Sequence, residues 1–209
     1  MTAIAPPVAK ILVDKLLGGI LLVATSPIWL LISIAIVVEG LASPASRGGL
    51  FHTEVRVSAG RPFTLYKFRI LKRAGEDEIK AGSKPKDVEN TPHNLTRTGW
   101  ILKKIGFDEL PQLLCVITGR MTLVGPRPKP VREYQDELAF GHIFRAQLRA
   151  GMTGPSQAMK GTSGTAEDRV AAEFAYAELM QRGPWPRILA ADFKTLMKTV
   201  LVVLRATGE

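Results

Sequence analysis

A long hydrophobic segment of the chain runs from Leu16 to Val38 and contains no charged residue. Its length reaches the roughly 20 residues that a transmembrane α-helix needs. A cleaved signal peptide fits poorly, because the apolar run is too long and no small-residue cleavage site follows it cleanly. The pattern therefore predicts a membrane-embedded helix near the N-terminus.

Two features of this segment argue against a straight spanning helix. The pair Ser26-Pro27 lies near its middle, where a proline removes a backbone hydrogen bond and kinks or breaks a helix. Both flanks carry basic residues, which favour the cytoplasmic side: Lys10, Lys15, Arg47 and Arg56. A re-entrant helix–break–helix over residues 1–40, broken at Ser26 and Pro27, satisfies both observations. A kinked spanning helix and a buried helix of a soluble protein are the alternatives.

Residues 41–209 are expected to form a second domain, with shorter polar and apolar patterns. The alternating aromatic segment 61–68 predicts a β-strand, and the polar segment 75–94, broken by prolines, predicts a long surface loop. Helix signals cover the segments 99–105 (a short basic helix or turn), 108–118, 131–147, 166–181 and 188–205. The predicted fold class is therefore α/β, dominated by helices, with a few short strands.

The last of these helices, 188–205, is amphipathic and basic. Its apolar residues on or near one face are Phe193, Leu196, Met197, Val200, Leu201 and Leu204. Lys194, Lys198 and Arg205 could meet anionic lipid, at roughly 1 kcal/mol each. Packing of the helix on the protein core is the alternative.

Composition narrows the partners of the chain. Lys and Arg number 28 against 19 Asp and Glu, a net charge of +9, which suits nucleic acid, anionic lipid or phosphorylated substrates. Only 7% of residues are aromatic and no basic–aromatic stacking pattern occurs, which argues against nucleic acid. Cys115, the single cysteine, lies in an apolar run and is interpreted as a small buried hydrophobe. The three histidines are scattered, so no zinc site is predicted.

The candidate chemistry centres on the adjacent carboxylates Asp108 and Glu109 at the start of the segment 108–118. The positive end of that helix, with Lys103 and Lys104 just upstream, is expected to keep Asp108 ionised. An ionised carboxylate can attack phosphorus, and its neighbour can hold Mg²⁺ against a diphosphate. Ordinary helix capping is the alternative.

Several basic residues are candidates for phosphate contacts. Arg127 lies between Pro126 and Pro128, which preorganise its guanidinium for bidentate binding, although a rigid surface turn has the same pattern. Lys67 and Arg69 alternate about a phenylalanine and could both face a phosphate, or form a solvated strand face.

Two further sets of charged residues are candidates for membrane or structural roles. Arg145 and Arg149 suit either a lipid phosphate or the membrane surface. Lys10 and Asp14 are one helical turn apart and predict a structural i,i+4 ion pair.

The order of these motifs resembles the bacterial sugar transferase family, the monotopic polyprenyl-phosphate phosphoglycosyl transferases. The motifs that carry the resemblance are residues 67–69, 108–113 and 121–128, and the likeness extends to Lys10 and Asp14, Ser26-Pro27, 60–63, 151–154 and Asp192. It therefore covers nearly the whole chain.

The resemblance implies a monotopic enzyme on the cytoplasmic face of the bacterial inner membrane, with amphipathic interfacial helices. It implies that Asp108 attacks the β-phosphate of a UDP-sugar, releasing UMP, and that polyprenyl (undecaprenyl) phosphate then takes the phosphosugar. It also implies that Glu109 supports Mg²⁺ binding and that Pro126-Arg127-Pro128 lies at the nucleotide site. Together with the candidates above, the predicted metal ligands are Asp108 and Glu109, and the predicted substrate-binding residues are Lys67, Arg69, Lys103, Pro126, Arg127, Pro128 and Arg145. The reaction would begin membrane-glycan, exopolysaccharide or glycoconjugate assembly. Membrane lipids are expected partners, and the oligomeric state, a homodimer included, stays open.

The chain departs from the family pattern at several positions. Lys103 stands in place of an arginine, Arg120 in place of an aspartate, Asn94 in place of an arginine and Ala150 in place of a proline. An inactive membrane-anchored adaptor of the same fold is therefore the alternative function. The intact pair Asp108-Glu109 argues against it.

Overall fold

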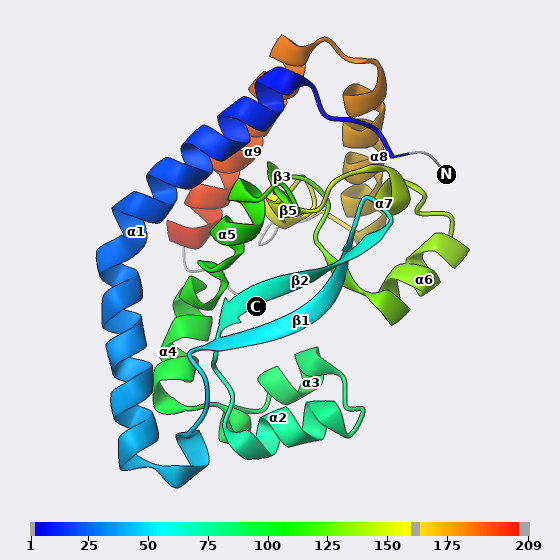
Figure 1. Ribbon diagram of the computed structural model, residues 1–209. Helices are drawn as coiled ribbons and strands as arrows, with labels where there is room; N and C mark the ends of the chain where they lie inside the picture. The colour runs from blue at the N-terminus through cyan, green and yellow to red at the C-terminus, as the bar shows by residue number, and fades with distance from the viewer. Residues whose placement is uncertain (1–2, 160–163, 205–209) are drawn as a thin grey trace. The chain divides into compact units, whose positions relative to one another are not determined.

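The computed structural model describes residues 3–159 and 164–204, and it is helix-rich with a few short strands, as predicted (Figure 1). In chain order the elements are α1 (Val8–Ala42), η1 (Pro44–Ser46), β1 (Phe51–Ser58), β2 (Arg61–Phe68), α2 (Arg73–Lys80), α3 (Pro85–Glu89), η2 (Pro92–Asn94), α4 (Arg97–Ile105), η3 (Phe107–Glu109), α5 (Gln112–Ile117), β3 (Thr122–Val124), β4 (Lys129–Pro130), α6 (Val131–Ala139), α7 (Phe144–Gln147), β5 (Gly151–Thr153), η4 (Gln157–Met159), α8 (Ala166–Arg182) and α9 (Trp185–Leu204).

The chain divides into two compact units. The terminal unit comprises Met1–Leu21, Glu54–Leu65 and Gln112–Glu209, and the central unit comprises Leu22–Thr53 and Tyr66–Pro111. Neither unit begins at residue 41, and the predicted domain boundary at residue 40 stays a prediction.

Some predicted elements are confirmed and others are wrong. The strand 61–68 and the helices near 99–105 and 166–181 are present as β2, α4 and α8. The predicted loop 75–94 is wrong, because it contains most of α2 and all of α3 and η2. Pro85 and Pro92 occupy first-turn positions of α3 and η2, where a helix needs no N–H, so they start helices here.

Two predicted helices have different limits in the structure. The segment 131–147 is split into α6 and α7, with Gly141 between them in a left-handed conformation at φ 86°. The C-terminal helix is present as α9 and begins at Trp185, whereas the predicted Arg205 lies outside the described residues. One face of α9 buries Ile188, as packing on the core requires, and the opposite face exposes Phe193 and Met197. Contact of that exposed face with anionic lipid stays a prediction.

The predicted interruption of helical structure at Ser26-Pro27 is wrong, because α1 continues through Pro27. A proline at this position cannot donate to the carbonyl of Val23, four residues earlier. The Ser26 hydroxyl donates to that carbonyl at 2.8 Å and replaces the missing bond. The serine of the pair therefore restores the hydrogen bond to the Val23 carbonyl that the proline cannot make. Re-entry of α1 into the bilayer stays a prediction.

α1 is long and apolar enough to cross a membrane, by length and composition alone. Few of its side chains are buried: Leu16, Val23, Leu30, Leu31 and Val38 are all exposed. A helix that is apolar all round needs an apolar environment, and the protein supplies little of it here.

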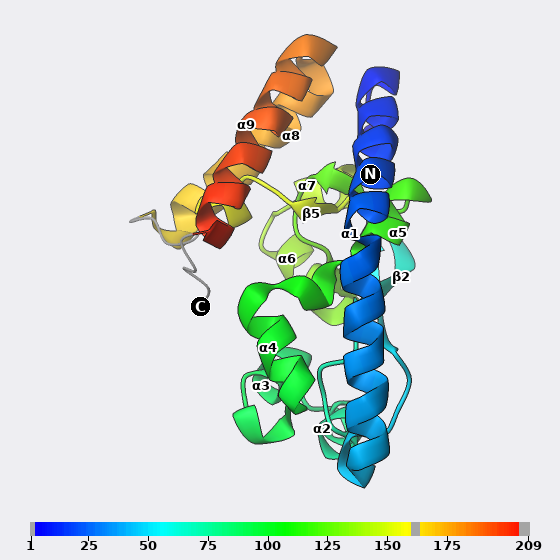
Figure 2. The ribbon, with the colours of Figure 1, turned by 90° about the vertical axis from the view of Figure 1, so that its left-hand side faces the viewer.

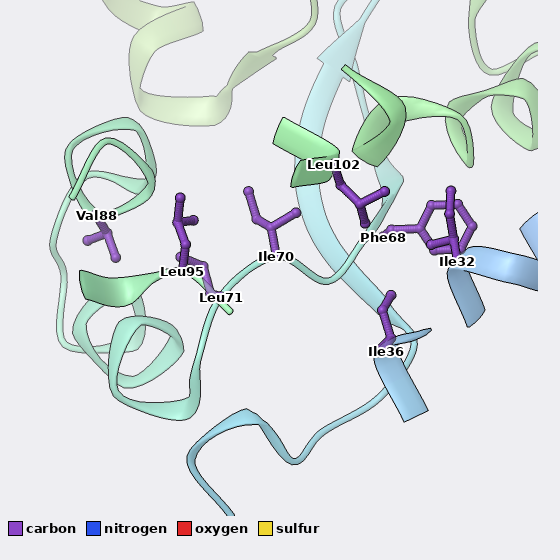
Figure 3. Close-up of a cluster of buried hydrophobic side chains, with 8 residues drawn as sticks. All are labelled: Ile32, Ile36, Phe68, Ile70, Leu71, Val88, Leu95 and Leu102. Atoms are coloured by element: carbon purple, nitrogen blue, oxygen red, sulfur yellow. The ribbon is translucent and has the colours of Figure 1, made fainter. Parts of the chain in front are cut away.

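The central unit is built around one hydrophobic cluster, shown in Figure 3. Its buried side chains are Ile32, Ile36, Phe68, Ile70, Leu71, Val88, Leu95 and Leu102. They come from α1, from β2 and the segment after it, from α3, from the segment between η2 and α4, and from α4 itself, so residues far apart in the sequence share this core. Trp29 packs edge-on against Phe68 at a centroid distance of 5.3 Å.

Gly99 in α4 allows the backbone of the central unit to pack closely. A Cβ at this position would lie 2.1 Å from the carbonyl oxygen of Ile70, well inside van der Waals contact. Gly99→Ala is therefore expected to lower the free energy of unfolding by about 1–3 kcal/mol through overpacking. Thermal unfolding of the purified chain in detergent measures this effect. Gly49→Ala is the control, because its Cβ would meet only Phe51 at 3.7 Å; equal melting temperatures for both variants would contradict the assignment.

The terminal unit joins short strands and helices through buried backbone contacts. β3 pairs with β5 in parallel, β1 pairs with β4 antiparallel, and α8 packs beside α9 (Figure 2). Gly125, Gly151 and Gly154 meet at the end of the β3–β5 pair, where a Cβ on Gly151 would lie 2.1 Å from the Gly125 nitrogen. Only glycines fit where these backbone segments pack against one another, and this close packing fixes the position of the segment that follows Gly125.

A buried polar network links both ends of the chain within this unit. Lys10, only 2% exposed, donates to Asp192 at 2.5 Å and to the Val124 carbonyl at 3.3 Å, and lies 3.6 Å from Asp14. Asp14 accepts from the Thr122 hydroxyl, and Tyr176 donates to Asp192 at 2.6 Å. The predicted pair Lys10–Asp14 is therefore confirmed, but it lies within a larger buried network.

Candidate functional site

The carboxylate pair lies in the short helix η3 of the central unit. Gly106, at φ 74°, ends α4 in a left-handed conformation and turns the chain into η3. Asp108 is 6% exposed and Glu109 is half-buried. The prediction that Asp108 caps the following helix is wrong, because α5 begins only at Gln112. Asp108 therefore has a buried position that capping does not explain.

Two lysines and a third carboxylate surround the pair. Lys67 of β2 places its Nζ 3.9 Å from Glu109 Oε1 and 4.0 Å from Glu89 Oε1. Lys103 of α4 donates to the Glu89 carbonyl at 2.5 Å and to Asn90 Oδ1 at 2.9 Å. We call Lys67, Glu89, Lys103, Asp108 and Glu109 the carboxylate cluster. Glu89 ends α3, in the segment predicted as a loop, and no sequence signal pointed to it.

Burial has the largest effect on the pKa values of Asp108 and Lys103 in this cluster. Burial first, and then the charges of Glu109 and Glu89, raise the pKa of Asp108 to about 7 against the opposing effect of Lys67. At neutral pH Asp108 is therefore only partly ionised in the protein alone, whereas the helix end and the neighbouring lysines were expected to keep it ionised. Burial also lowers the pKa of Lys103, although Glu89 and Asp108 oppose this. Additional positive charge at the cluster would favour the ionised form of Asp108.

The donor set suits a hard cation that also binds a substrate. Within residues 3–159 and 164–204, no group of three or more His, Cys, Asp or Glu side chains has the arrangement of a ready-made metal site. Mg²⁺ usually takes one or two carboxylates and completes its shell with substrate phosphates and water. Asp108 and Glu109 fit that pattern.

Arg69 donates its hydrogen bonds to backbone carbonyls and not to the carboxylate cluster. Its Nε donates to the Gly49 carbonyl at 2.7 Å and its Nη1 to the Leu71 carbonyl at 3.3 Å, and the residue is buried. Phe68 packs in the core, as expected. The contacts of Arg69 therefore describe a structural residue, and its predicted phosphate contact has no support from the geometry.

The segment Pro126–Pro128 lies in the terminal unit, where Arg145 fixes it. Arg145 Nη1 donates to the Arg127 carbonyl at 3.0 Å, Nε to Glu137 at 3.0 Å and Nη2 to Glu173 at 3.1 Å. Although burial opposes it, hydrogen bonds from His142 and Arg145 lower the pKa of Glu137, so this carboxylate stays ionised. Each guanidinium nitrogen of Arg145 already has a protein partner, which favours positioning of Arg127 over phosphate binding.

Comparison with known proteins identifies the family of the chain. The sequence profile of the family described as bacterial sugar transferase matches residues 6–206. The chain belongs to the bacterial sugar transferase family. The predicted family and the predicted enzyme class, a sugar-phosphate transferase, are therefore confirmed.

Three relatives illustrate the range of the bacterial sugar transferase family. The chain is 33% identical to the uncharacterized sugar transferase EpsL of Bacillus subtilis (strain 168), covering 92% of this chain and 86% of EpsL. It is 32% identical to the UDP-glucose:undecaprenyl-phosphate glucose-1-phosphate transferase of Caulobacter vibrioides, and the match covers 94% of this chain and 70% of that protein. It is 30% identical to the UDP-N-acetylgalactosamine-undecaprenyl-phosphate N-acetylgalactosaminephosphotransferase of Aeromonas hydrophila, covering 90% of this chain. The chain spans only 42% of that last protein.

Two of the departures from the bacterial sugar transferase pattern have structural partners outside the carboxylate cluster, and a third is exposed. Asn94 is buried and donates to Glu78 at 3.1 Å. The N–H of Ala150 donates to the Ser58 hydroxyl at 3.0 Å, a bond that proline could not make. Arg120 is exposed. Only Lys103 belongs to the cluster, and it keeps the positive charge there.

Proposed function

We propose that this chain transfers a sugar phosphate from a UDP-sugar to polyprenyl phosphate, undecaprenyl phosphate in bacteria, and releases UMP. The observation that carries the proposal is the buried pair Asp108-Glu109 beside Lys67 and Lys103, in a chain of this family. The names of the Caulobacter and Aeromonas relatives support the donor and acceptor classes, and they differ in the sugar. The sugar used by this chain is therefore left to experiment.

In the first half-reaction, a carboxylate oxygen of Asp108 attacks the β-phosphorus of the UDP-sugar. A new phosphorus–oxygen bond forms to Asp108, and the bond between this phosphorus and the oxygen bridging to the α-phosphate breaks. UMP leaves with the bridging oxygen, and the sugar phosphate remains on Asp108 as an acyl phosphate. Lys67 and Lys103 would offset negative charge on the phosphoryl oxygens.

In the second half-reaction, a phosphate oxygen of the polyprenyl phosphate attacks the same phosphorus. The bond to Asp108 breaks, the carboxylate is restored, and a polyprenyl diphosphate sugar leaves. When bound by Asp108 and Glu109, Mg²⁺ supplies charge neutralisation at the diphosphate. Arg127, whose backbone Arg145 holds, is proposed to contact the nucleotide phosphates. Such a scheme has ping-pong kinetics and begins the assembly of an exopolysaccharide or glycoconjugate.

We place the enzyme on the cytoplasmic face of the bacterial inner membrane, entering it from one side. The exposed apolar surface of α1 supports burial in lipid, and the exposed Phe193 and Met197 on α9 support contact with the interface. Lys194 and Lys198 on the same helix are exposed and suit anionic lipid. The acceptor, a lipid phosphate, is available at that surface.

UMP release tests the function directly. The full chain, purified in detergent with Mg²⁺ and polyprenyl phosphate, is given a panel of UDP-sugars, and UMP is quantified. Release with one donor, dependent on the acceptor beyond the first turnover, would establish the reaction and name the sugar. The absence of UMP with every donor would favour the inactive adaptor instead.

Metal dependence is the sharper test of Glu109. Chelation of Mg²⁺ is expected to reduce UMP release to background, because the diphosphate charge is then opposed only by lysines. Glu109→Gln is expected to raise the Mg²⁺ concentration needed for half-maximal rate, by roughly tenfold or more. Glu133→Gln, at an exposed position of α6, is the matched control. Turnover that is untouched by chelation would rule out the proposed role of Glu109.

A further inference from the structure

A cavity of about 720 Å³ lies within the central unit and has no role in the reaction above. Glu39 and Ser46 line it from the end of α1 and from η1, Lys72 precedes α2, and Arg97, Trp100 and Ile101 belong to α4. No member of the carboxylate cluster is among its described lining residues. The volume is within the range of ligand pockets in proteins, roughly 300–1,000 Å³.

The only acidic residue in the described lining already has its hydrogen bonds. The Glu39 carboxylate accepts from the backbone nitrogens of Arg97 and Thr98, both at 2.8 Å, and from the Ser46 hydroxyl at 3.2 Å. These contacts join the last turn of α1 to the first turn of α4, and they oppose the carboxylate charge with a positive helix end. Glu39 therefore builds the wall of the cavity and does not make it a cation site.

Apart from Glu39, the charged residues in the described lining of the cavity are both cations, Lys72 and Arg97. Lys72 Nζ donates to the His93 carbonyl at 2.8 Å, and Arg97 is exposed. Two more exposed arginines lie beside the lining: Arg47 donates to the Gly40 carbonyl, and Arg73 donates to the Arg47 carbonyl. The charge of this region therefore fits an anion.

Apolar side chains stand next to these cations. Trp100 is 51% exposed and Ile101 is 53% exposed, and the last turns of α1 expose Val37, Val38 and Leu41. The Lys104 ammonium lies 5.2 Å from the centre of the Trp100 ring. Exposed tryptophan beside basic residues, at the end of an apolar helix, is the pattern of a membrane–water interface on the cytoplasmic side. Figure 2 shows this end of α1 in the central unit, followed by the segment that contacts α2.

We propose that this cavity binds the headgroup of an anionic phospholipid. The phosphate lies between Lys72 and Arg97, and the glycerol and the start of the acyl chains lie against Trp100 and Ile101. The lipid orients the central unit on the membrane surface and is not consumed. This inference rests on the membrane attachment proposed above and not on the transfer reaction.

Native mass spectrometry of the full chain, released from detergent, tests the proposal. Phosphatidylglycerol and phosphatidylcholine with identical acyl chains are added separately. The native chain is expected to retain one phosphatidylglycerol in preference to phosphatidylcholine. The double variant Lys72→Gln/Arg97→Gln is expected to bind phosphatidylglycerol roughly 30-fold more weakly, because two cations beside an anionic headgroup are lost. Binding of phosphatidylcholine should not change.

The double variant Lys80→Gln/Lys84→Gln is the matched control, since both lysines are exposed in the same unit and lie outside the described lining. Its lipid retention should equal that of the native chain. Equal retention of the two lipids, or unchanged phosphatidylglycerol binding in Lys72→Gln/Arg97→Gln, would overturn the proposal.

Two competitors separate other sources of phosphate. Inorganic phosphate that displaces the lipid at equal concentration would identify a free anion as the ligand and reject the lipid. Displacement by polyprenyl phosphate, with a raised KM for the acceptor in the variant, would assign the cavity to the acceptor instead. Because lipid retention is measured without turnover, its result does not depend on whether UMP is released.

Discussion

Asp108→Asn is expected to reduce UMP release by at least about a thousandfold, since an amide cannot form the acyl phosphate. Asparagine has nearly the shape of aspartate, so the buried site is not emptied. Because burial and two neighbouring carboxylates raise the pKa of Asp108 to about 7, removal of its charge should not destabilise the fold. The melting temperature of the variant is therefore expected to equal or exceed that of the native chain. Loss of activity with retained stability separates catalysis from folding.

Trapping of the covalent intermediate tests directly whether a bond forms between Asp108 and the sugar phosphate. Without acceptor, the native chain incubated with the UDP-sugar and Mg²⁺ should gain the mass of one sugar phosphate, whereas Asp108→Asn should gain none. Asp87→Asn, at an exposed position of α3, is the control and should behave like the native chain. Equal UMP release from native chain and Asp108→Asn would show that the nucleophile is another group.

Lys10→Met is expected to cause the largest loss of stability, lowering the free energy of unfolding by about 3–5 kcal/mol. The methionine fills similar space, but Asp14 and Asp192 then lose the ammonium that lies 3.6 Å and 2.5 Å away. Burial already raises the pKa of Asp192 against the opposing effect of Lys10. Without the lysine, these carboxylates are buried charges with no cation in the described network, or must take up protons. Denaturant unfolding of the purified chain in detergent measures the loss.

A second substitution identifies the cause of that loss. Lys10→Met/Asp192→Asn is expected to regain part of the stability, because the amide keeps the hydrogen bond from Tyr176 without a buried charge. Lys80→Met is the control, since its pair with Asp77 is exposed and such pairs contribute about 0–1 kcal/mol. A loss in Lys10→Met no larger than in Lys80→Met would mean that the buried network does not stabilise the fold.

The sequence predicted those features that depend on neighbouring residues. The apolar run of α1, the alternation in β2 and the periodicity of α8 are local patterns, and the structure contains all three elements. The ordered motifs 67–69, 108–113 and 121–128 indicated the family, which the comparison confirmed. Local patterns are ambiguous at prolines, which occur both in loops and in the first turn of a helix: Pro85 and Pro92 fit a loop by sequence, yet they begin helices.

Only the tertiary structure decided how the charged side chains are used. Sequence treated Lys67 and Arg69 alike, but β2 brings Lys67 to the carboxylates, whereas Arg69 binds carbonyls of its own unit. Glu89 carries no sequence signal, because its position beside Lys67 depends on the packing of α3 against distant segments.

The ionisation of Asp108 shows the same division between sequence and structure. The charges near it in sequence predicted an ionised carboxylate, but its pKa depends first on burial. Burial is set by contacts between segments distant along the chain, which local patterns do not contain. The sequence by itself determined the long apolar helix α1 and, through the family, the class of chemistry. The tertiary structure determined which charges reach the cluster and that Lys10 connects α1 to α9, since both depend on long-range packing.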